Sequence, residues 1–355
     1  MGLAEETYRM THRPRHANPI IKYDGKDRKE LYTSVDSLEY TDFAEGNSDE
    51  ISITISDQKS DFLNGFFPET GKNLDVYLDY YHWYKPETKE TYHCGDFTID
   101  DITIKAGPRE LVIKGVSQPS NSEFKSTPRT KTWQETTLKT IAAEYMQLYQ
   151  MTGTLYFHGA DPAIKEIKQE EESDLAFLSR ICEKYGFCLK IYKLALVIFQ
   201  KSGYEGRKPL KIYNRDLEWE PGWTWNRTLS GTYTGAKISY TNPNKPKRRK
   251  KGEEPLPDIE VLVGTEGRIL YLNETVDTEA EAIETAKARV NKENEKIETL
   301  SFTTMFDPNL VASSVIEVTN LPHVEGRYFV SQVRVSMSQS GLKMRVSAYK
   351  ITQRL

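Results

Sequence analysis

Long apolar runs are absent from the 355-residue sequence. No stretch approaches the ~18 consecutive apolar residues that a membrane helix needs. The first residues lack a basic segment followed by an apolar one, so no secretory signal is predicted. Cysteine is also scarce: Cys94, Cys182 and Cys188 are an odd, sparse set, which favours buried thiols in a reducing compartment over a disulfide framework. We therefore expect synthesis in a bacterial cytoplasm.

No charge of one sign dominates the composition. The formal net charge is −4, with 37% hydrophobic and 28% charged residues. This balance excludes collagen-like and largely disordered chains, and it does not require a nucleic-acid or acidic-membrane partner. The length predicts two or three domains of ~100–200 residues each.

The motifs of common enzyme classes are missing. Neither the G-x-x-x-x-G-K-[ST] nor the G-x-G-x-x-G phosphate loop is present, and the six histidines are scattered. His93-Cys94 is the nearest approach to a thiol–imidazole pair, but neighbours on a strand point to opposite faces, so we predict an exposed His beside a buried Cys. Cys182 and Cys188 lack a second pair at zinc-finger spacing. We predict no catalytic residue, metal or cofactor, although counting carboxylates alone does not exclude a glycosidase-type pair.

The first third of the chain alternates with period two, which is typical of strands with one buried face. The segment I-S-I-T-I-S (51–56) shows this most clearly, and a Pro-containing stretch at 85–89 predicts a hairpin tip. We predict an N-terminal arm over residues 1–17 and an antiparallel barrel or sandwich over 18–120.

A small α+β module is predicted over residues 121–205. It follows a stretch rich in Ser, Pro and Asn (117–128), which is typical of a linker. Thr132 and Glu135 have the spacing of a capping box, in which each side chain binds the other residue's free backbone amide. We therefore predict that a first helix starts at Thr132.

A second helix of this module is predicted to start at Ser173, a favourable N-cap residue. Residues 170–172 and Asp174 would place negative charge at the positive end of the helix dipole, in a solvated position. Gly186 lies where a left-handed C-terminal cap is expected. Residues at helical spacing form an apolar stripe that we expect to be buried: Leu175, Leu178, Ile181, Cys182 and Tyr185.

A second β domain is predicted over residues 206–355. It contains a helix over 278–298 and a hairpin around a turn at 339–341. Residues 241–257 are predicted to be an exposed loop, because prolines and like charges both oppose packing. The basic cluster of this loop comprises Lys247, Arg248, Arg249, Lys250 and Lys251.

Two surface features admit a ligand-binding alternative. Aromatics on a strand that runs into a hairpin tip could stack on sugars or bases, but they more often pack across the sheet or into a subunit interface. The basic cluster could contact nucleic acid, but it lacks interleaved aromatics, so we favour a solvated loop or an acidic protein partner. The aromatic residues that we predict to form an interface are Tyr80, Tyr81, Trp83 and Tyr84.

The segment 169–187 resembles a known family signature. Its residues fit the pattern Q-x-x-E-S-D-x-x-F-L-x-R-x-x-x-x-x-G of the phage late control protein D family, which includes contractile-tail baseplate hubs and the hub part of valine-glycine-repeat spikes of type VI secretion. The matching positions are Gln169, Glu172, Ser173, Asp174, Phe177, Leu178, Arg180 and Gly186.

A second resemblance lies towards the C-terminus. The helical segment 280–294 and the residues 307–310 (D-P-N-L) are similar to a helix and a D-P-x-L-x-x-G-x-x-V-x-V strand of that family. Ser313 stands where the family has glycine. Residues 326–330 resemble its G-x-Y-x-V strand. The resemblance spans roughly residues 130–350, whereas the N-terminal third agrees in strand pattern only.

The resemblance implies a fold that is mainly β with an α+β insert, in which two tube-type antiparallel β-barrel domains flank the small module. It also implies three chains around an axis, so that six β domains form a ring between a sixfold tail tube and a threefold spike. The expected partners are the chain itself as a homotrimer, the tail tube protein, other baseplate proteins and a tape measure protein. Because the sequence ends at Leu355 directly after a strand, a separate central spike protein is expected too.

Our leading interpretation is a structural hub in the baseplate of an extracellular tail particle or virion, with no membrane partner before firing. Whether the particle is a phage or a bacteriocin, and whether DNA passes through it, stays open. Two other classes remain as alternatives. A tail-tip cell-wall hydrolase would need paired acids or a Cys–His pair in a cleft. A glycan- or nucleic-acid-binding module would use the aromatic run or the basic loop.

Overall fold

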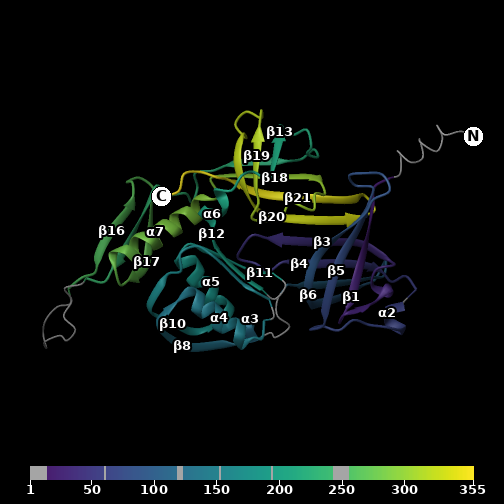
Figure 1. The fold of residues 1–355 in the computed structure, drawn as a ribbon, viewed down its shortest axis with the longest axis horizontal. Coiled ribbons are helices and arrows are strands. Elements are labelled where there is room, and N and C mark those ends of the chain that lie inside the picture. The colour runs from purple at the N-terminus through teal and green to yellow at the C-terminus, as the bar shows by residue number, and fades with distance from the viewer. Residues whose placement is uncertain (1–13, 60, 118–122, 152, 193–194, 243–255) are drawn as a thin grey trace, which may run out of the picture.

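The computed structural model describes residues 14–59, 61–117, 123–151, 153–192, 195–242 and 256–355. Strands predominate among them, and the predicted mainly β fold with an α+β insert is confirmed. Figure 1 shows a large sheet formed by both ends of the chain, with the middle of the chain arranged in two smaller bodies beside it. No helix in the described ranges is long and apolar enough to cross a membrane.

The large sheet has 13 strands within the described residues, in the order β14-β18-β21-β20-β3-β4-β7-β6-β5-β1-β2, with β13 and β19 attached through β20. Two short helical turns, η1 (Lys29–Leu31) and α2 (Asp61–Asn64), accompany its N-terminal strands. Those strands are β1 (His16–Tyr23), β2 (Lys26–Asp27), β3 (Val35–Phe43), β4 (Glu50–Ser56), β5 (Asn73–Tyr81), β6 (Lys89–Lys105) and β7 (Glu110–Val116). The C-terminal strands are β13 (Lys211–Asn214), β14 (Thr224–Arg227), β18 (Glu298–Met305), β19 (Val315–Thr319), β20 (Gly326–Ser338) and β21 (Gly341–Lys350).

The period-two pattern of the sequence corresponds to the two faces of this sheet. In β4 the isoleucines at 51, 53 and 55 are buried, whereas the serines and threonine between them are half-buried. The hairpin predicted around 85–89 is confirmed, because β5 and β6 pair as antiparallel neighbours on either side of it. Alternation of this kind buries one apolar face and leaves the other polar.

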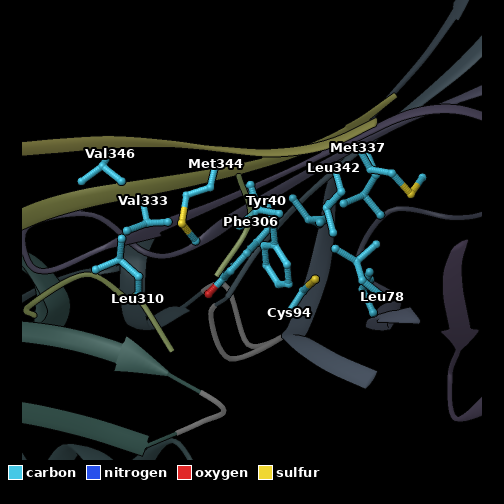
Figure 2. Close-up of a cluster of buried hydrophobic side chains, with 14 of the residues drawn as sticks. Tyr40, Leu78, Cys94, Phe306, Leu310, Val333, Met337, Leu342, Met344 and Val346 are labelled. Carbon is cyan, nitrogen blue, oxygen red and sulfur yellow. The ribbon is translucent and has the colours of Figure 1, made fainter. Parts of the chain in front are cut away.

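The two ends of the chain meet where β3 pairs with β20. The pairing is antiparallel and runs from Leu38 opposite Met337 to Phe43 opposite Gln332. A shared core lies beneath the junction. Figure 2 shows side chains from both halves packed together, including Tyr40, Leu78, Cys94, Phe306, Leu310, Val333, Met337, Leu342, Met344 and Val346.

The middle module has its own core between two small sheets and its helices. One sheet pairs β8 with β10, and the other has the order β11-β12-β9. Helices α4 and α5 pack between them with Ile141, Phe177 and Leu178 fully buried. The elements are α3 (Glu123–Ser126), β8 (Pro128–Thr137), α4 (Leu138–Leu148), β9 (Leu155–His158), β10 (Ala163–Ser173), α5 (Asp174–Lys184), β11 (Phe187–Tyr192), β12 (Ala195–Gln200) and α6 (Lys201–Glu205).

The predicted start of the first helix at Thr132 is wrong. Residues 128–137 form strand β8, and the helix begins only at Leu138, where the Thr137 hydroxyl accepts a hydrogen bond from the Thr140 amide at 3.2 Å. Pairing with β10, some 30 residues further along the chain, favours the strand and buries Trp133. The capping-box spacing is a local pattern, and this non-local pairing overrides it.

The predicted linker is also partly structured, since α3 places Phe124 in the core of the middle module.

A third body combines a three-stranded sheet with one long helix. Its elements are β15 (Gly235–Tyr240), β16 (Ile259–Gly264), β17 (Ile269–Val276) and α7 (Glu279–Asn294). Small residues of the helix, Ala282 and Ala286, pack with Val290 against Ala236 and Ile238 of the sheet. The helix predicted over 278–298 is therefore confirmed, with Thr278 as its N-cap.

Candidate assembly site

The signature segment forms the end of β10 and the whole of α5. The Ser173 hydroxyl accepts a hydrogen bond from the Ala176 amide at 3.3 Å, so the predicted cap is present. Phe177, Leu178 and Ile181 are fully buried, whereas Leu175 is half-buried. The sequence pattern at these positions therefore builds a capped helix with one buried face.

Asp174 has a different environment from the one predicted. It is fully buried and not solvated at the helix start. The Gln169 amide donates to its Oδ1 at 2.6 Å, the Tyr149 hydroxyl donates to its Oδ2 at 2.5 Å, and the Arg129 Nε lies 3.4 Å from Oδ2. These three partners come from β10, the C-cap of α4 and β8, so one carboxylate connects the elements of the module and is satisfied despite its burial.

The acidic residues before Ser173 are also not part of the helix N-terminus. They lie on β10, where the strand has a bulge between Gln169 and Glu172. The Glu172 carboxylate forms a two-point ion pair with Arg180, whose Nη2 and Nε lie 2.5 and 3.2 Å from Oε1 and Oε2. Arg180 also donates to the Lys168 carbonyl at 2.8 Å. This pair therefore connects the surface of α5 to β10.

Gly186 ends α5 in the left-handed conformation, with φ +71°, as the sequence predicted. A Cβ at this position would lie 3.4 Å from the Cβ of Ala288 on α7. The glycine therefore relieves backbone strain and also allows α7 to approach the end of α5.

The middle module meets the large sheet along a seam on β11 and β12. In β11 the residues Leu189 and Ile191 point into the core of the module, whereas Cys188 and Lys190, which alternate with them, face the seam. Figure 1 shows both strands next to the large sheet. The apolar part of the seam comprises Ala44, Cys188, Phe199, Ala312, Phe329 and Tyr349.

A buried lysine with two acidic neighbours crosses this seam. The Lys190 ammonium pairs with Asp42, lies 3.3 Å from Asp49 and donates to the Phe43 carbonyl at 2.9 Å. Burial lowers the pKa of Lys190, but the two carboxylates outweigh burial and raise it. Burial raises the pKa of Asp49 to about 7 despite the attraction of Lys190.

A second ionic cluster joins all three bodies. The buried Lys201 ammonium of α6 pairs with Glu45 of the large sheet and with Glu295 after α7, at 2.6 Å from the latter, while Lys292 also pairs with Glu45. Burial acts to raise the pKa of Glu45, but Lys201 and Lys292 outweigh it and hold the value at about 2.

The C-terminal tail is attached to the same region. The Arg354 guanidinium makes two contacts of 2.6 Å with the Glu205 carboxylate, and the Tyr349 hydroxyl donates to Glu205 at 2.8 Å. Removing one member of a charged pair that is shielded from water is destabilising, because the other member is left as an uncompensated charge. The seam is therefore a contact in which specific charged partners meet. None of these long-range pairs could be read from the sequence, because the partners are far apart in the chain.

The aromatic run divides between core and surface. Tyr80 and Trp83 are buried, and the Trp83 indole donates to the Phe306 carbonyl at 2.7 Å. Tyr81 is half-buried and stacks on His16 at 4.5 Å, whereas Tyr84 is 57% exposed. Of the four predicted interface aromatics, only Tyr81 and Tyr84 therefore reach the surface.

Tyr84 borders a groove of about 700 Å³ at this end of the large sheet. Its walls include two exposed apolar side chains, Leu217 at 75% and Met305 at 50%. Lys211 and Lys343 in the same groove are paired with Glu218 and Glu220 at 2.7 Å each. The groove therefore combines apolar side chains with paired charges, a mixture that is typical of protein–protein interfaces.

The basic cluster Lys247–Lys251 lies outside the described residues, so its role stays a prediction. His93 and Cys94 point to opposite faces of the sheet, as predicted: Cys94 is in the core, and half-buried His93 stacks on Tyr77 at 4.3 Å. In the described ranges, the ligand atoms of Asp75, His93 and Asp96 lie within 4.8 Å of one another, which would suit a metal ion.

Comparison with known proteins gives the class of protein. The chain is 22% identical over 344 residues to the probable baseplate hub protein of Escherichia phage 186, covering 86% of this chain and 85% of that protein. It is 26% identical over 168 residues to the probable baseplate hub protein of Escherichia phage P2, covering 47% of this chain and 40% of the relative. No family model matches the sequence.

Solved structures share the fold. A 43 kDa tail protein of prophage MuSo2 from Shewanella oneidensis superposes with a TM-score of 0.67 at 13% identity, covering 94% of this chain and 98% of that one. A tail protein from Neisseria meningitidis MC58 gives 0.68 at 12% identity, covering 94% and 96%. The E. coli c3393 protein, a component of the type VI secretion system, gives 0.56 at 14% identity, covering 94% and 77%.

These comparisons confirm the resemblance seen in the sequence. The relatives are hub proteins of phage tail baseplates, and the structural neighbours are tail and type VI secretion proteins. The chain accordingly has a structural role as a hub protein of a phage tail baseplate, and its relatives are named as structural proteins and not as enzymes.

Proposed function

We propose that the chain forms a homotrimeric ring with pseudo-sixfold symmetry, which joins the tail tube of a contractile particle to a threefold central spike. One observation supports this most directly: the two β-rich ends of the chain lie side by side in a single sheet through the pairing of β3 with β20. Two such halves in each of three chains give six adjacent units, the number that a sixfold tube requires.

The outer edges of the sheet support ring closure. Within the described residues, β14 pairs only with β18, and β2 pairs only with β1. Open strand edges pair readily with other chains, and a closed ring covers them. The groove beside Tyr84, with its exposed Leu217 and Met305, provides a further surface on which a neighbouring baseplate protein could pack.

The proposed partners are a second and third copy of the chain, a separate spike protein, the tail tube protein, other baseplate proteins and a tape measure protein. The hub would assemble in the bacterial cytoplasm and then belong to an extracellular tail particle. A fold shared with a VgrG protein solved in complex with PdpA of Francisella, at a TM-score of 0.53 and 10% identity, is compatible with such assemblies.

Light scattering of the purified chain, alone and mixed with the proposed spike protein, tests the ring. A trimer mass in either sample is expected. The double substitution Thr224→Lys and Asn226→Lys places two charges on the exposed edge strand β14. It should reduce the trimer fraction at least about tenfold, because charges on a strand edge oppose pairing.

The matched control for that edge variant is Ser336→Lys, near the C-terminal end of β20, a strand that is paired on both sides by β21 and β3. It should leave the mass unchanged. A monomer mass in both samples, with no co-elution of the spike protein, would reject the ring while leaving the fold comparison intact.

A further inference from the structure

Asp42 and Asp49 lie on either side of the turn between β3 and β4 and face one ammonium group, that of Lys190 on β11. Lys190 pairs with Asp42 and lies 3.3 Å from Asp49. The exposed fractions of the two carboxyl side chains are only 5% and 1%. Two ionised carboxylates and one ammonium would leave a buried net charge of −1, which is costly away from water.

The two carboxyl groups are not held equally. Asp42 accepts a further hydrogen bond from the Ala312 amide at 2.8 Å, in addition to its direct contact with Lys190. Asp49 accepts one from the Phe43 amide at 3.0 Å and a long one from the Tyr40 hydroxyl at 3.4 Å. Lys190 nevertheless lies closer to Asp42 than to Asp49, so the uncompensated charge falls mainly on Asp49.

Among the described residues, Lys190 is the cation that pairs with Asp49. The remaining titratable side chains that face this cluster are Tyr40 from β3, Tyr92 and Cys94 from β6, and Tyr192 from β11. Burial raises the pKa of Tyr40, Tyr92 and Cys94, so these three groups stay neutral at physiological pH. A proton on Asp49 is therefore the means by which this cluster reaches neutrality.

We propose that Asp42, Asp49 and Lys190 form a pH-sensitive joint, which holds the middle module firmly on the large sheet when Asp49 is protonated and loosens when Asp49 ionises. Lys190 belongs to the module and both aspartates belong to the sheet, so opening the seam hydrates all three groups. Opening therefore favours the ionised form of Asp49, and ionisation in turn favours opening.

The direction of the pH dependence follows from the raised pKa of Asp49, about 7 in the closed joint. A hydrated aspartate has a pKa of about 3.9. The joint is therefore most stable below about pH 4 and loses stability as the pH rises through 7. In the neighbouring cluster Glu45 and Glu295 face two ammonium groups, those of Lys201 and Lys292; these hold the pKa of Glu45 at about 2, whereas burial raises the pKa of Glu295.

Amide hydrogen exchange of the full chain between pH 5 and pH 8, corrected for the intrinsic pH dependence of exchange, tests the proposal. The amides of β11 report directly on opening of the seam. Their opening constant should rise at least about tenfold from pH 5 to pH 8 in the wild type, since one proton is released on opening. This rise should be absent in Asp49→Asn.

Two further variants sharpen the test. Asp42→Asn leaves one carboxylate for one ammonium, so Asp49 should ionise in its ordinary range and the rise between pH 5 and pH 8 should disappear as well. Asp101→Asn, on the exposed side of β6 with half of its side chain accessible, should keep the wild-type rise. Parallel pH profiles in the wild type and Asp49→Asn would overturn the proposal.

A direct readout covers the case in which Asp49→Asn does not fold. The wild type, labelled with ¹³C at aspartate carboxyl groups, should show a resonance that titrates between pH 5 and pH 8 and that no longer titrates there in Asp42→Asn. If no such resonance exists, Asp49 keeps one protonation state throughout this range and the joint is not pH-sensitive there. Neither measurement depends on the trimer, so its outcome is independent of the proposed ring.

Discussion

Replacement of Leu178 by aspartate should unfold the middle module while leaving the large sheet folded. Leu178 is fully buried on α5 between the two small sheets of the module. Loss of a buried leucine side chain costs about 2–5 kcal/mol through lost apolar burial and the cavity left behind. A buried carboxylate without a partner adds several kcal/mol. Together these costs reach the ~5–15 kcal/mol that stabilises a typical domain.

Tryptophan fluorescence during urea unfolding can follow the module separately. Of the five tryptophans, Trp133 lies in this module, where it stacks on Phe177 with ring centroids 6.3 Å apart. The other four belong to the large sheet and its core. The fluorescence of these four tryptophans is measured in a Trp133→Phe variant and subtracted. In Leu178→Asp the Trp133 signal should be that of unfolded protein without denaturant, while the other tryptophans keep their native signal.

Leu175→Asp is the matched control. It places the same charge on the same helix, but Leu175 is half-buried and its new carboxylate can reach water. It should lower the unfolding free energy by no more than about 1–2 kcal/mol. An unchanged urea transition for Leu178→Asp would refute the position of the buried face of α5.

Three further predictions concern single positions. Gly186→Ala should lower the free energy of unfolding by about 1–2 kcal/mol in thermal unfolding, because the φ of Gly186 is +71°. The loss should exceed that of the control Gly71→Ala, since Gly71 has φ +83° but an added Cβ there would meet nothing within 4 Å. Equal losses would show that the contact with α7 is unimportant. Lys201→Met should cost about 3–5 kcal/mol in urea unfolding, because Lys292 alone then faces the half-buried carboxylates of Glu45 and Glu295, and a loss below about 1 kcal/mol would contradict the cluster at the seam. Because the pKa of Glu45 is lowered to about 2, its contribution is present above pH ~4.3 and is lost as pH falls towards 2; Glu45→Gln should remove this part of the acid dependence of the melting temperature.

The candidate site was only partly predictable. The cap at Ser173, the buried stripe of α5 and the left-handed Gly186 each depend on residues within one or two helical turns, so the pattern contains them. The environment of Asp174 is different, because its partners Arg129 and Tyr149 lie on other elements. From sequence alone, an aspartate at this position is indistinguishable from one that interacts with the helix dipole.

Some of this protein is determined by local sequence. Alternation of apolar and polar residues in segments such as β4 produces strands with one buried face, since the side-chain period of a strand is two. Strand partners and buried charge pairs are decided only in the tertiary structure. Pairing of β3 with β20 joins residues almost 300 positions apart, and Lys190 meets Asp42 across 148 positions. Such contacts depend on which surfaces meet after the chain has collapsed, and the local sequence pattern contains no information about this.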